Sequence, residues 1–191
     1  MTTLERGEAL VIGGGPAGLL AAREMAKRGF KVTVIEEHPE IGEPNHCAGL
    51  LSIEGLKRIG VEPSPNFIHN RVKGGRVISP GGIIIELKDT RDRAYVVDRA
   101  AFDRRLAEQA MEAGAEIREG LRARELILKE GKVEGARGRG WEFMAEVTID
   151  AEGGVRTLAR QLGLVRAGDG ALTGVNVEVS GVDVEPEMVE V

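Results

Sequence analysis

Cysteine is almost absent from the sequence, and several other features that mark particular protein classes are missing as well. The single cysteine, Cys47, excludes an internal disulfide framework and a zinc site built from several thiolates. The net charge is −5 and no run of Lys or Arg occurs, which argues against binding to nucleic acid. Aromatic residues make up only 3% of the chain, with one Trp, one Tyr and four Phe.

Long apolar runs are also missing. The longest apolar stretch, from Ala9 to Ala22, is shorter than the roughly 20 residues that a membrane-spanning helix needs. It lacks the basic start and the cleavage signal of a secretory peptide. We therefore expect a cytoplasmic protein, which can make transient contact with a membrane surface. Only four Asn and two Gln stand beside abundant Glu and Arg, which favours a thermophilic source.

The most informative feature that is present is a glycine-rich loop at residues 13–18, in the pattern Gly-x-Gly-x-x-Gly. Residues 8–12 predict a short buried strand before the loop, and residues 16–28 predict a helix after it. Residues 31–35 then predict a second strand that leads directly to Glu36. In this strand–helix–strand context the loop is typical of dinucleotide binding.

Each residue of this motif has a physical role in such a site. Gly13 lets the chain turn out of the strand, and Gly15 lets the backbone approach a pyrophosphate. Gly18 lets the helix pack closely on the strand, while the N–H groups at the helix start attract the phosphate charge. Glu36 is expected to accept hydrogen bonds from ribose hydroxyls. The loop alone leaves NAD(P) and FAD open as ligands.

The elements that follow favour FAD over NAD(P), because NAD-dependent dehydrogenases more often continue with regular βαβ units. Antiparallel strands are predicted here after the second parallel strand instead. A helix is predicted over 52–59 with Ser52 as its N-cap, followed by a hairpin of strands 71–78 and 83–87 around Ser79-Pro80-Gly81-Gly82. A strand over 95–97 and a helix that Asp98 caps and Gly114 ends come next. The last predicted elements are strands over 116–118, 122–128, 132–136 and 141–150 and a helix over 156–162.

The predicted fold is therefore α/β, a Rossmann-type FAD-binding domain with inserted antiparallel strands that begin a substrate domain. Residues 1–70 and 98–165 are assigned to the FAD-binding domain, and residues 71–97 and 171–191 to the antiparallel strands. Alternating valines at residues 175–179 predict a strand, and residues 189–191 appear as the start of another. Because the chain stops inside a β pattern, we expect it to be a fragment of a longer architecture.

Several segments together resemble one known family. They are Val11-Ile12-Gly13-Gly14-Gly15-Pro16-Ala17-Gly18, Glu36, Pro44-Asn45-His46-Cys47-Ala48-Gly49-Leu50-Leu51-Ser52, Ser79-Pro80-Gly81-Gly82, Tyr95-Val96-Val97-Asp98-Arg99, Phe102-Asp103, Ile149-Asp150-Ala151-Glu152-Gly153 and Val177-Glu178-Val179-Ser180-Gly181-Val182. These segments resemble the archaeal geranylgeranyl reductases, which are FAD proteins of the p-hydroxybenzoate hydroxylase-like fold. The resemblance implies reduction of isoprenoid double bonds in archaeal membrane lipids, with NADPH or another reductant as electron donor.

The resemblance also implies roles for individual residues in FAD binding. Ala17 matches a pyrophosphate contact, beside Glu36 on the ribose. The loop of Cys47, Ala48 and Gly49 matches a segment that lies along the flavin, and Cys47 is the candidate contact near the isoalloxazine. The remaining two matches are Arg99, which reaches the cofactor from the start of a helix, and Ala123, which contacts the adenine side through its backbone.

Independent arguments apply to two of these residues. A lone cysteine such as Cys47 is more often a small buried apolar residue than a reactive thiol. The helix dipole disfavours a cation such as Arg99 in a first helical turn unless an anion compensates it, and a pyrophosphate is such an anion. One departure is Glu152, because the superfamily usually has Asp before the glycine that follows.

Three functions from different classes remain open on the sequence alone. The first is an FAD-dependent reductase of geranylgeranyl lipids, and the second is another flavoprotein monooxygenase or dehydrogenase of the same superfamily. The third is a non-catalytic FAD-binding half that needs a partner chain. Because the family's second flavin motif lies beyond residue 191, we expect this chain alone to bind FAD weakly and not to turn over. A homo-oligomer or a second chain is expected to complete the fold.

Overall fold

The structure is a computed structural model that describes residues 3–166 and 174–191. These residues form two compact units, 3–44 with 103–166 and 45–102 with 174–191. The predicted assignment placed its boundaries near residues 70 and 98 instead, and its residues 171–173 lie outside the described part of the chain. Which functional domain each unit represents stays a prediction.

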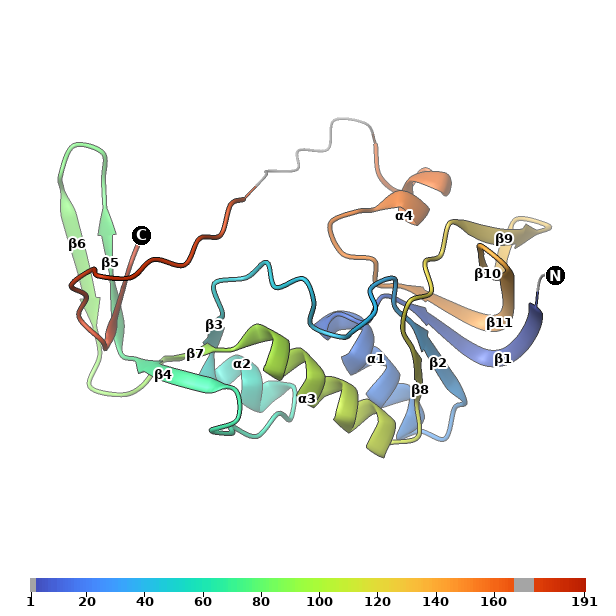
Figure 1. Ribbon diagram of the computed structural model, residues 1–191, viewed down its shortest axis with the longest axis horizontal. Coiled ribbons are helices and arrows are strands. Elements are labelled where there is room, and N and C mark those ends of the chain that lie inside the picture. The colour runs from blue at the N-terminus through green and yellow to red at the C-terminus, as the bar shows by residue number, and fades with distance from the viewer. Residues whose placement is uncertain (1–2, 167–173) are drawn as a thin grey trace. The chain divides into compact units, whose positions relative to one another are not determined.

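The first unit is built on a six-stranded mixed sheet (Figure 1). In order across the sheet, the strands are β8 (Glu116–Arg118), β2 (Val32–Ile35), β1 (Thr3–Ile12), β11 (Trp141–Asp150), β10 (Lys132–Gly138) and β9 (Glu125–Lys129). The first four run parallel, whereas β9, β10 and β11 form an antiparallel meander. This arrangement is the predicted α/β core of Rossmann type.

Both faces of the sheet are covered by other elements. The side chains of β1 alternate between the two faces. Ala9 and Val11 pack on one face against helix α1 (Pro16–Ala26) and the end of helix α3 (Arg99–Glu112). Leu10 and Ile12 point to the other face, which is covered by residues of the meander and of the short helix α4 (Thr157–Gln161). All four β1 side chains are buried. The loop that follows Ile12 therefore leaves from a strand whose last four side chains are all buried.

The strand–helix–strand prediction at the start of the chain is confirmed, with three differences in its bounds, one of which is that β2 begins at Val32 rather than at residue 31. Strand β1 begins five residues earlier than predicted, at Thr3, because Thr3 pairs with Trp141 of β11. Helix α1 ends at Ala26 rather than at residue 28, and Gly29 follows it with a positive φ of 87°. That backbone conformation is favourable for glycine and ends the helix.

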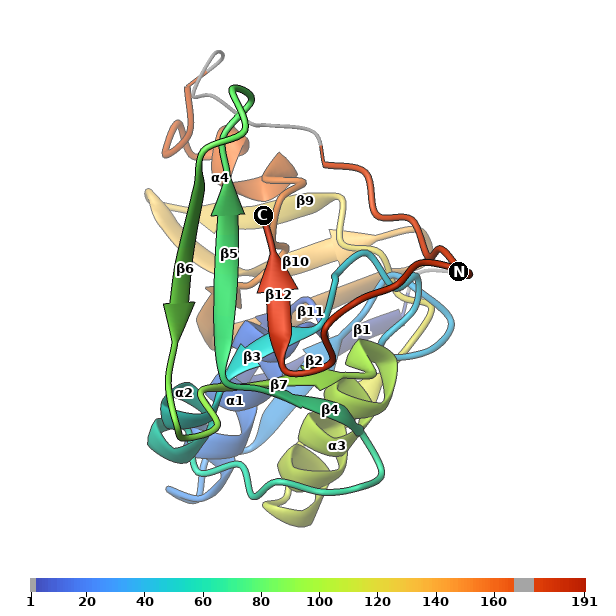
Figure 2. The same cartoon turned by 90° about the vertical axis from the view of Figure 1, so that its left-hand side faces the viewer.

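The second unit contains two three-stranded sheets and one short helix. One sheet has the order β3 (Leu50–Ser52), β7 (Ala94–Val97) and β4 (Ile68–Val72), and helix α2 (Ile53–Arg58) follows β3. The other sheet has the order β12 (Met188–Glu190), β5 (Gly74–Ile78) and β6 (Ile84–Lys88), which lie side by side in Figure 2. The predicted hairpin is confirmed, since the Ile83 N–H donates to the Ser79 hydroxyl at 3.0 Å.

Four predictions about strands are corrected by the structure. The predicted strand over 71–78 is two strands, because the chain leaves β4 at Lys73, whose N–H donates to Glu187 at 2.9 Å. The predicted strand over 122–128 begins only at Glu125. The strand predicted to start over residues 189–191 runs instead from Met188 to Glu190. Residues 175–179 form no strand in the described part of the chain, since no neighbouring strand offers them hydrogen-bond partners.

The predicted cap of helix α3 is confirmed, because Asp98 Oδ1 accepts a hydrogen bond from the Ala101 N–H at 3.0 Å. We expect Asp98→Ala to lower the free energy of unfolding by about 1 kcal/mol, since that N–H loses its acceptor. Urea denaturation followed by circular dichroism measures the change. Asp98→Asn, which keeps a side-chain acceptor, should stay close to the wild type. Equal midpoints for the alanine variant and the wild type would show that the cap contributes nothing.

Candidate functional site

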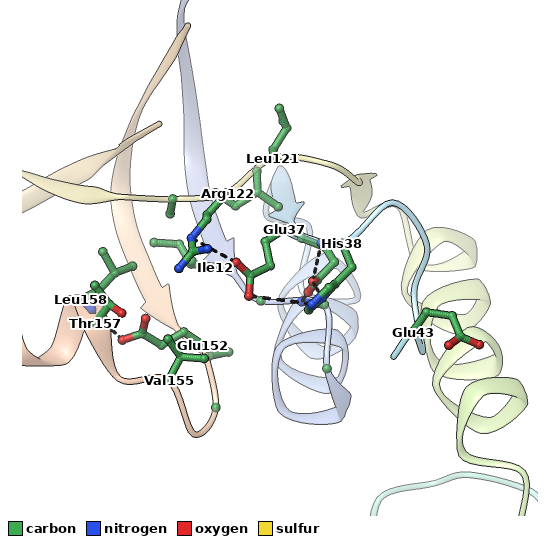
Figure 3. Close-up of a pocket in the computed structure, with 18 of the residues that line it drawn as sticks. Ile12, Glu37, His38, Glu43, Leu121, Arg122, Glu152, Val155, Thr157 and Leu158 are labelled. Carbon is green, nitrogen blue, oxygen red and sulfur yellow. Dashed lines mark hydrogen bonds and ion pairs between the residues drawn. The ribbon is translucent and has the colours of Figure 1, made fainter. Parts of the chain in front are cut away.

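A pocket of about 270 Å³ lies in the first unit, where the glycine loop leaves β1 (Figure 3). Its walls come from segments that are distant in the sequence. They are residues 12–15 in the glycine loop, residues 35–38 and 42–44 after β2, Asp103 in α3, residues 121–123 before β9, and residues 151–153, 155, 157 and 158 between the end of β11 and the start of α4. The parallel strands β1, β2 and β11 all end at this edge of the sheet, which is where ligands bind in open α/β sheets.

The glycines of the loop differ in what a side chain would meet. A Cβ on Gly13, which has a φ of 110°, would lie 2.3 Å from the carbonyl oxygen of Ala151. A Cβ on Gly18 would lie 2.0 Å from the carbonyl oxygen of Gly13. Gly15 has no atom within 4 Å of its added Cβ. Gly13 and Gly18 are therefore required by the fold, whereas the space above Gly15 is available to a ligand.

The start of α1 has the properties of an anion site. Gly15 is the N-cap and Pro16 the first helical residue, and no side chain among the described residues caps this helix end. The N–H groups of the first turn, including that of Ala17, carry the positive end of the helix dipole. A pyrophosphate fits this position, because backbone donors can reach it past glycines that have no Cβ.

Glu36 lies at the end of β2 with only 9% of its surface exposed. Its Oε2 accepts a hydrogen bond from the Gly14 N–H at 2.6 Å, and its Oε1 accepts one from the His38 N–H at 2.9 Å. His38 Nδ1 lies 2.6 Å from the same Oε1. The carboxylate is therefore held against the glycine loop, as its predicted role toward a ribose requires.

A second wall of the pocket is formed by residues 121–123. One of its side chains, Arg122, forms a charged pair with Glu37 that the sequence did not predict. Glu37 and Arg122 point toward one another in Figure 3, with Arg122 Nε 3.2 Å from Glu37 Oε2. The adjacent Leu121 N–H donates to the Glu36 carbonyl at 2.7 Å, which fixes this wall to the end of β2. Ala123, predicted to contact an adenine, lines the same wall.

The third wall shows why a glutamate at position 152 suits this chain. Glu152 Oε1 accepts hydrogen bonds from the backbone N–H groups of Leu158 at 2.7 Å and Ala159 at 3.2 Å (Figure 3). The helix α4 has no side-chain cap at its own N-cap residue, Arg156. The Glu152 carboxylate thus satisfies the start of α4. The pKa of the nearby Asp150 carboxyl is raised above its ordinary value, because partial burial disfavours the charged form. A hydrogen bond from the Glu152 N–H to Asp150 opposes this shift in part.

Shortening this side chain tests its role. We expect Glu152→Asp to destabilise the protein by about 1 kcal/mol, because the carboxylate no longer reaches the α4 backbone. Thermal denaturation measures the loss. The control is Glu146→Asp, which shortens an exposed side chain on β11 in the same way. A loss of similar size in both variants would contradict a specific cap by Glu152.

The remaining predicted site residues belong to the second unit. The Cys47 N–H donates to Asn45 Oδ1 at 3.2 Å, and its half-buried Sγ accepts from the Gly49 N–H at 3.4 Å. Gly49 is required by the fold, because an added Cβ would lie 2.2 Å from the Val97 carbonyl oxygen. The loop that also holds Ala48 is thus shaped by its own contacts. A role for these three residues at the flavin stays a prediction.

Arg99 occupies the first turn of α3, as predicted. Its guanidinium carbon lies 5.9 Å from the ring centre of Phe102, within the range of a cation–π contact. The Asp98 cap adds a negative charge beside it at the helix start. The negative charge of Asp98 offsets part of the unfavourable interaction between the Arg99 charge and the helix dipole. The contact of Arg99 with a cofactor stays a prediction.

Comparison with known proteins shows which dinucleotide the chain's family binds. Residues 6–190 match the model of a family described as FAD binding domain. The chain belongs to this FAD-binding family. Membership confirms the predicted FAD over NAD(P), and it confirms the predicted fold class.

Members of one reductase family are similar to this FAD-binding chain over nearly its whole length. The digeranylgeranylglycerophospholipid reductase of Methanosarcina acetivorans is 37% identical, over 96% of this chain and 47% of its own. The second such reductase of Methanothermobacter thermautotrophicus is 38% identical, over 96% of this chain and 49% of its own. The predicted resemblance to the archaeal geranylgeranyl reductases is confirmed. The chain spans about half the length of these curated relatives.

A solved structure agrees with the sequence comparison. The geranylgeranyl bacteriochlorophyll reductase-like protein of Thermoplasma acidophilum superimposes with a TM-score of 0.83 at 33% identity. The superposition covers 98% of this FAD-binding chain and 50% of that protein. PqsL of Pseudomonas aeruginosa, at 18% identity and a TM-score of 0.70 over 88% of this chain and 48% of its own, shares the fold alone.

Two further features are absent from the part of the chain that the structure describes. Among residues 3–166 and 174–191, no helix is long and apolar enough to span a membrane. The same residues contain no group of three or more His, Cys, Asp or Glu side chains placed to hold a metal ion.

Proposed function

We propose that this chain provides the FAD-binding part of a reductase that saturates isoprenoid double bonds of archaeal membrane lipids. The observation that carries the proposal is 37–38% identity to digeranylgeranylglycerophospholipid reductases over 96% of the chain. The pocket in the first unit supports it, because its glycine loop, uncapped helix start and Glu36 suit an ADP-like group. The activity is proposed for the whole protein, because those relatives are about twice as long as this chain.

In this proposal the chain's residues bind and orient the cofactor. Backbone N–H groups at the start of α1 hold the pyrophosphate, with Gly15 leaving room for it. The Glu36 carboxylate accepts hydrogen bonds from the ribose, and the wall containing Ala123 receives the adenine. The bound FAD supplies the hydride chemistry, as cofactors do in such enzymes, while the protein supplies position and excludes water.

The finer parts of the proposal concern partners. NADPH or another small reductant is the proposed electron donor. The proposed substrate is a geranylgeranyl lipid, which brings the protein into transient contact with a membrane surface from the cytoplasm. A homo-oligomer or a second chain is proposed to contribute the segments that cover the flavin ring.

The test combines cofactor identification with turnover. The purified chain is unfolded gently, and the released cofactor is identified by its absorption spectrum and its mass. In a separate sample, the folded chain is combined with the segments proposed above to cover the flavin ring and is supplied with dithionite or NADPH and a digeranylgeranyl glycerophospholipid, and saturation of the lipid is followed by mass spectrometry. Saturation that requires bound FAD supports the reductase. Bound FAD that reacts with oxygen and leaves the lipid unchanged would favour a monooxygenase of the same superfamily.

A further inference from the structure

We propose that His38 is a positioning residue, which holds the Glu36 carboxylate in the orientation that the ribose of FAD requires. The inference rests on the proposed function, because it takes Glu36 as the ribose ligand. It concerns a residue two positions beyond the recognised motif, on the wall of the same pocket.

The first argument is an asymmetry between the two carboxylate oxygens. Glu36 Oε1 faces both the backbone N–H of His38, at 2.9 Å, and its ring Nδ1, at 2.6 Å. Glu36 Oε2 accepts one hydrogen bond, from the Gly14 N–H at 2.6 Å. A carboxylate offers about four acceptor positions. The remaining position therefore lies on Oε2, the oxygen next to the glycine loop, where a ribose hydroxyl can donate.

The second argument is that His38 is itself fixed in place. The Gly120 N–H donates to the His38 carbonyl at 2.8 Å, and the Leu121 N–H donates to the Glu36 carbonyl at 2.7 Å. Both ends of the segment from Glu36 to His38 are thereby bonded to the wall that carries Arg122. The imidazole has a rigid backbone from which to hold the flexible glutamate side chain.

The third argument comes from the charged groups around the ring. Because a carboxylate oxygen can only accept, Nδ1 must carry the proton in the bond to Glu36. On the other side, His38 Nε2 lies 4.0 Å from Glu37 Oε1, and Arg122 pairs with the other Glu37 oxygen at 3.2 Å. Arg122 therefore holds Glu37, while His38 at 2.6 Å is the side-chain partner of Glu36.

The experiment is a double-mutant cycle on FAD affinity, measured by quenching of flavin fluorescence. We expect Glu36→Ala to weaken binding about 10- to 150-fold, as for a lost hydrogen bond to a charged group. We expect His38→Ala to weaken it roughly 3- to 10-fold. The double variant should bind no more weakly than Glu36→Ala, because His38 acts through Glu36.

Two further variants separate positioning from general damage. His38→Asn places an amide donor near the position of Nδ1 and should restore most of the affinity. His69→Ala removes an exposed histidine from β4 and should leave binding unchanged. If Glu36→Ala has no effect, the ribose site of the proposed function fails. If Glu36→Ala weakens binding but His38→Ala does not, or if the two losses add, the positioning role is wrong.

A measurement without ligand keeps the inference testable even when FAD binds too weakly to titrate. Nitrogen-15 NMR of the histidine rings reports which nitrogen is protonated. In the wild type we expect the His38 ring to carry its proton on Nδ1, and in Glu36→Ala we expect a mixture of tautomers. A wild-type ring protonated only on Nε2 would overturn the proposal.

Discussion

A Gly18→Ala variant is expected to lose about 3 kcal/mol of folding stability and nearly all FAD binding. The added Cβ would lie 2.0 Å from the Gly13 carbonyl oxygen and 3.2 Å from a methyl group of Val11. Backbone cannot move away as a flexible side chain can, so α1 must shift outward from β1 and the loop must change with it. Thermal unfolding and FAD titration of the same sample measure both losses.

Two other glycines serve as matched controls for this prediction. Gly15→Ala places its Cβ in open space and should leave the melting temperature near the wild-type value while weakening FAD binding, since the pyrophosphate needs that space. Gly154→Ala, with nothing within 4 Å of the added Cβ, should change neither. A Gly18→Ala protein as stable as the Gly154→Ala protein would contradict the packing argument.

Replacing Glu36 with alanine is expected to weaken FAD binding by about 1.5–3 kcal/mol, because a charge-assisted hydrogen bond to the ribose is lost. The same change leaves the N–H groups of Gly14 and His38 without their acceptor. Isothermal titration calorimetry measures the affinity. Glu36→Gln, which keeps the shape and one acceptor oxygen, should fall between the alanine variant and the wild type.

Competition with a second dinucleotide completes this test. NAD is titrated into the wild type and into Glu36→Ala beside FAD, and Glu146→Ala on β11 serves as an exposed control. FAD should bind the wild type more tightly than NAD, with no change in the control. Tight binding of NAD without binding of FAD would show that the cofactor assignment is wrong.

Features that depend on neighbours in the sequence were predicted well. The glycine loop, α1 and the second strand follow one another within 36 residues, and each is specified by its own glycine or apolar pattern. The caps at Ser52 and Asp98 are equally local, and the structure has both hydrogen bonds. The hairpin around residues 79–82 is specified by its turn residues. Local chemistry was enough to predict these elements.

Features set by distant partners were missed. The first five residues of β1 carry no strong strand pattern, and they are strand because β11 lies beside them. Alternating valines at 175–179 carry a strong pattern but have no strand beside them in the described residues, and Val175 is 86% exposed. A pattern of side chains thus predicts a strand only where the fold supplies the pairing.

The candidate site divides in the same way. Gly13, Gly15, Gly18 and Glu36 were recognisable because they stand at fixed spacings within one motif. The pair formed by Glu37 and Arg122 joins segments 85 residues apart, and no local signal indicates it. The Glu152 cap could have been suspected from a carboxylate shortly before a helix that has no other cap.

The pairing of β1 with β11 also sets the order of events during synthesis. Thr3 to Ile12 leave the ribosome long before Trp141 to Asp150, one of the two strands that pair with them. At about 5–20 residues per second, that partner follows roughly 7 to 30 seconds later. The Ala151 N–H, which donates to the Ile12 carbonyl at 2.8 Å, arrives with it. One edge of β1 can pair early with β2, whereas the other edge stays without its partner until residues 141–150 have emerged, and the dinucleotide pocket closes only after residues 151–158 have followed.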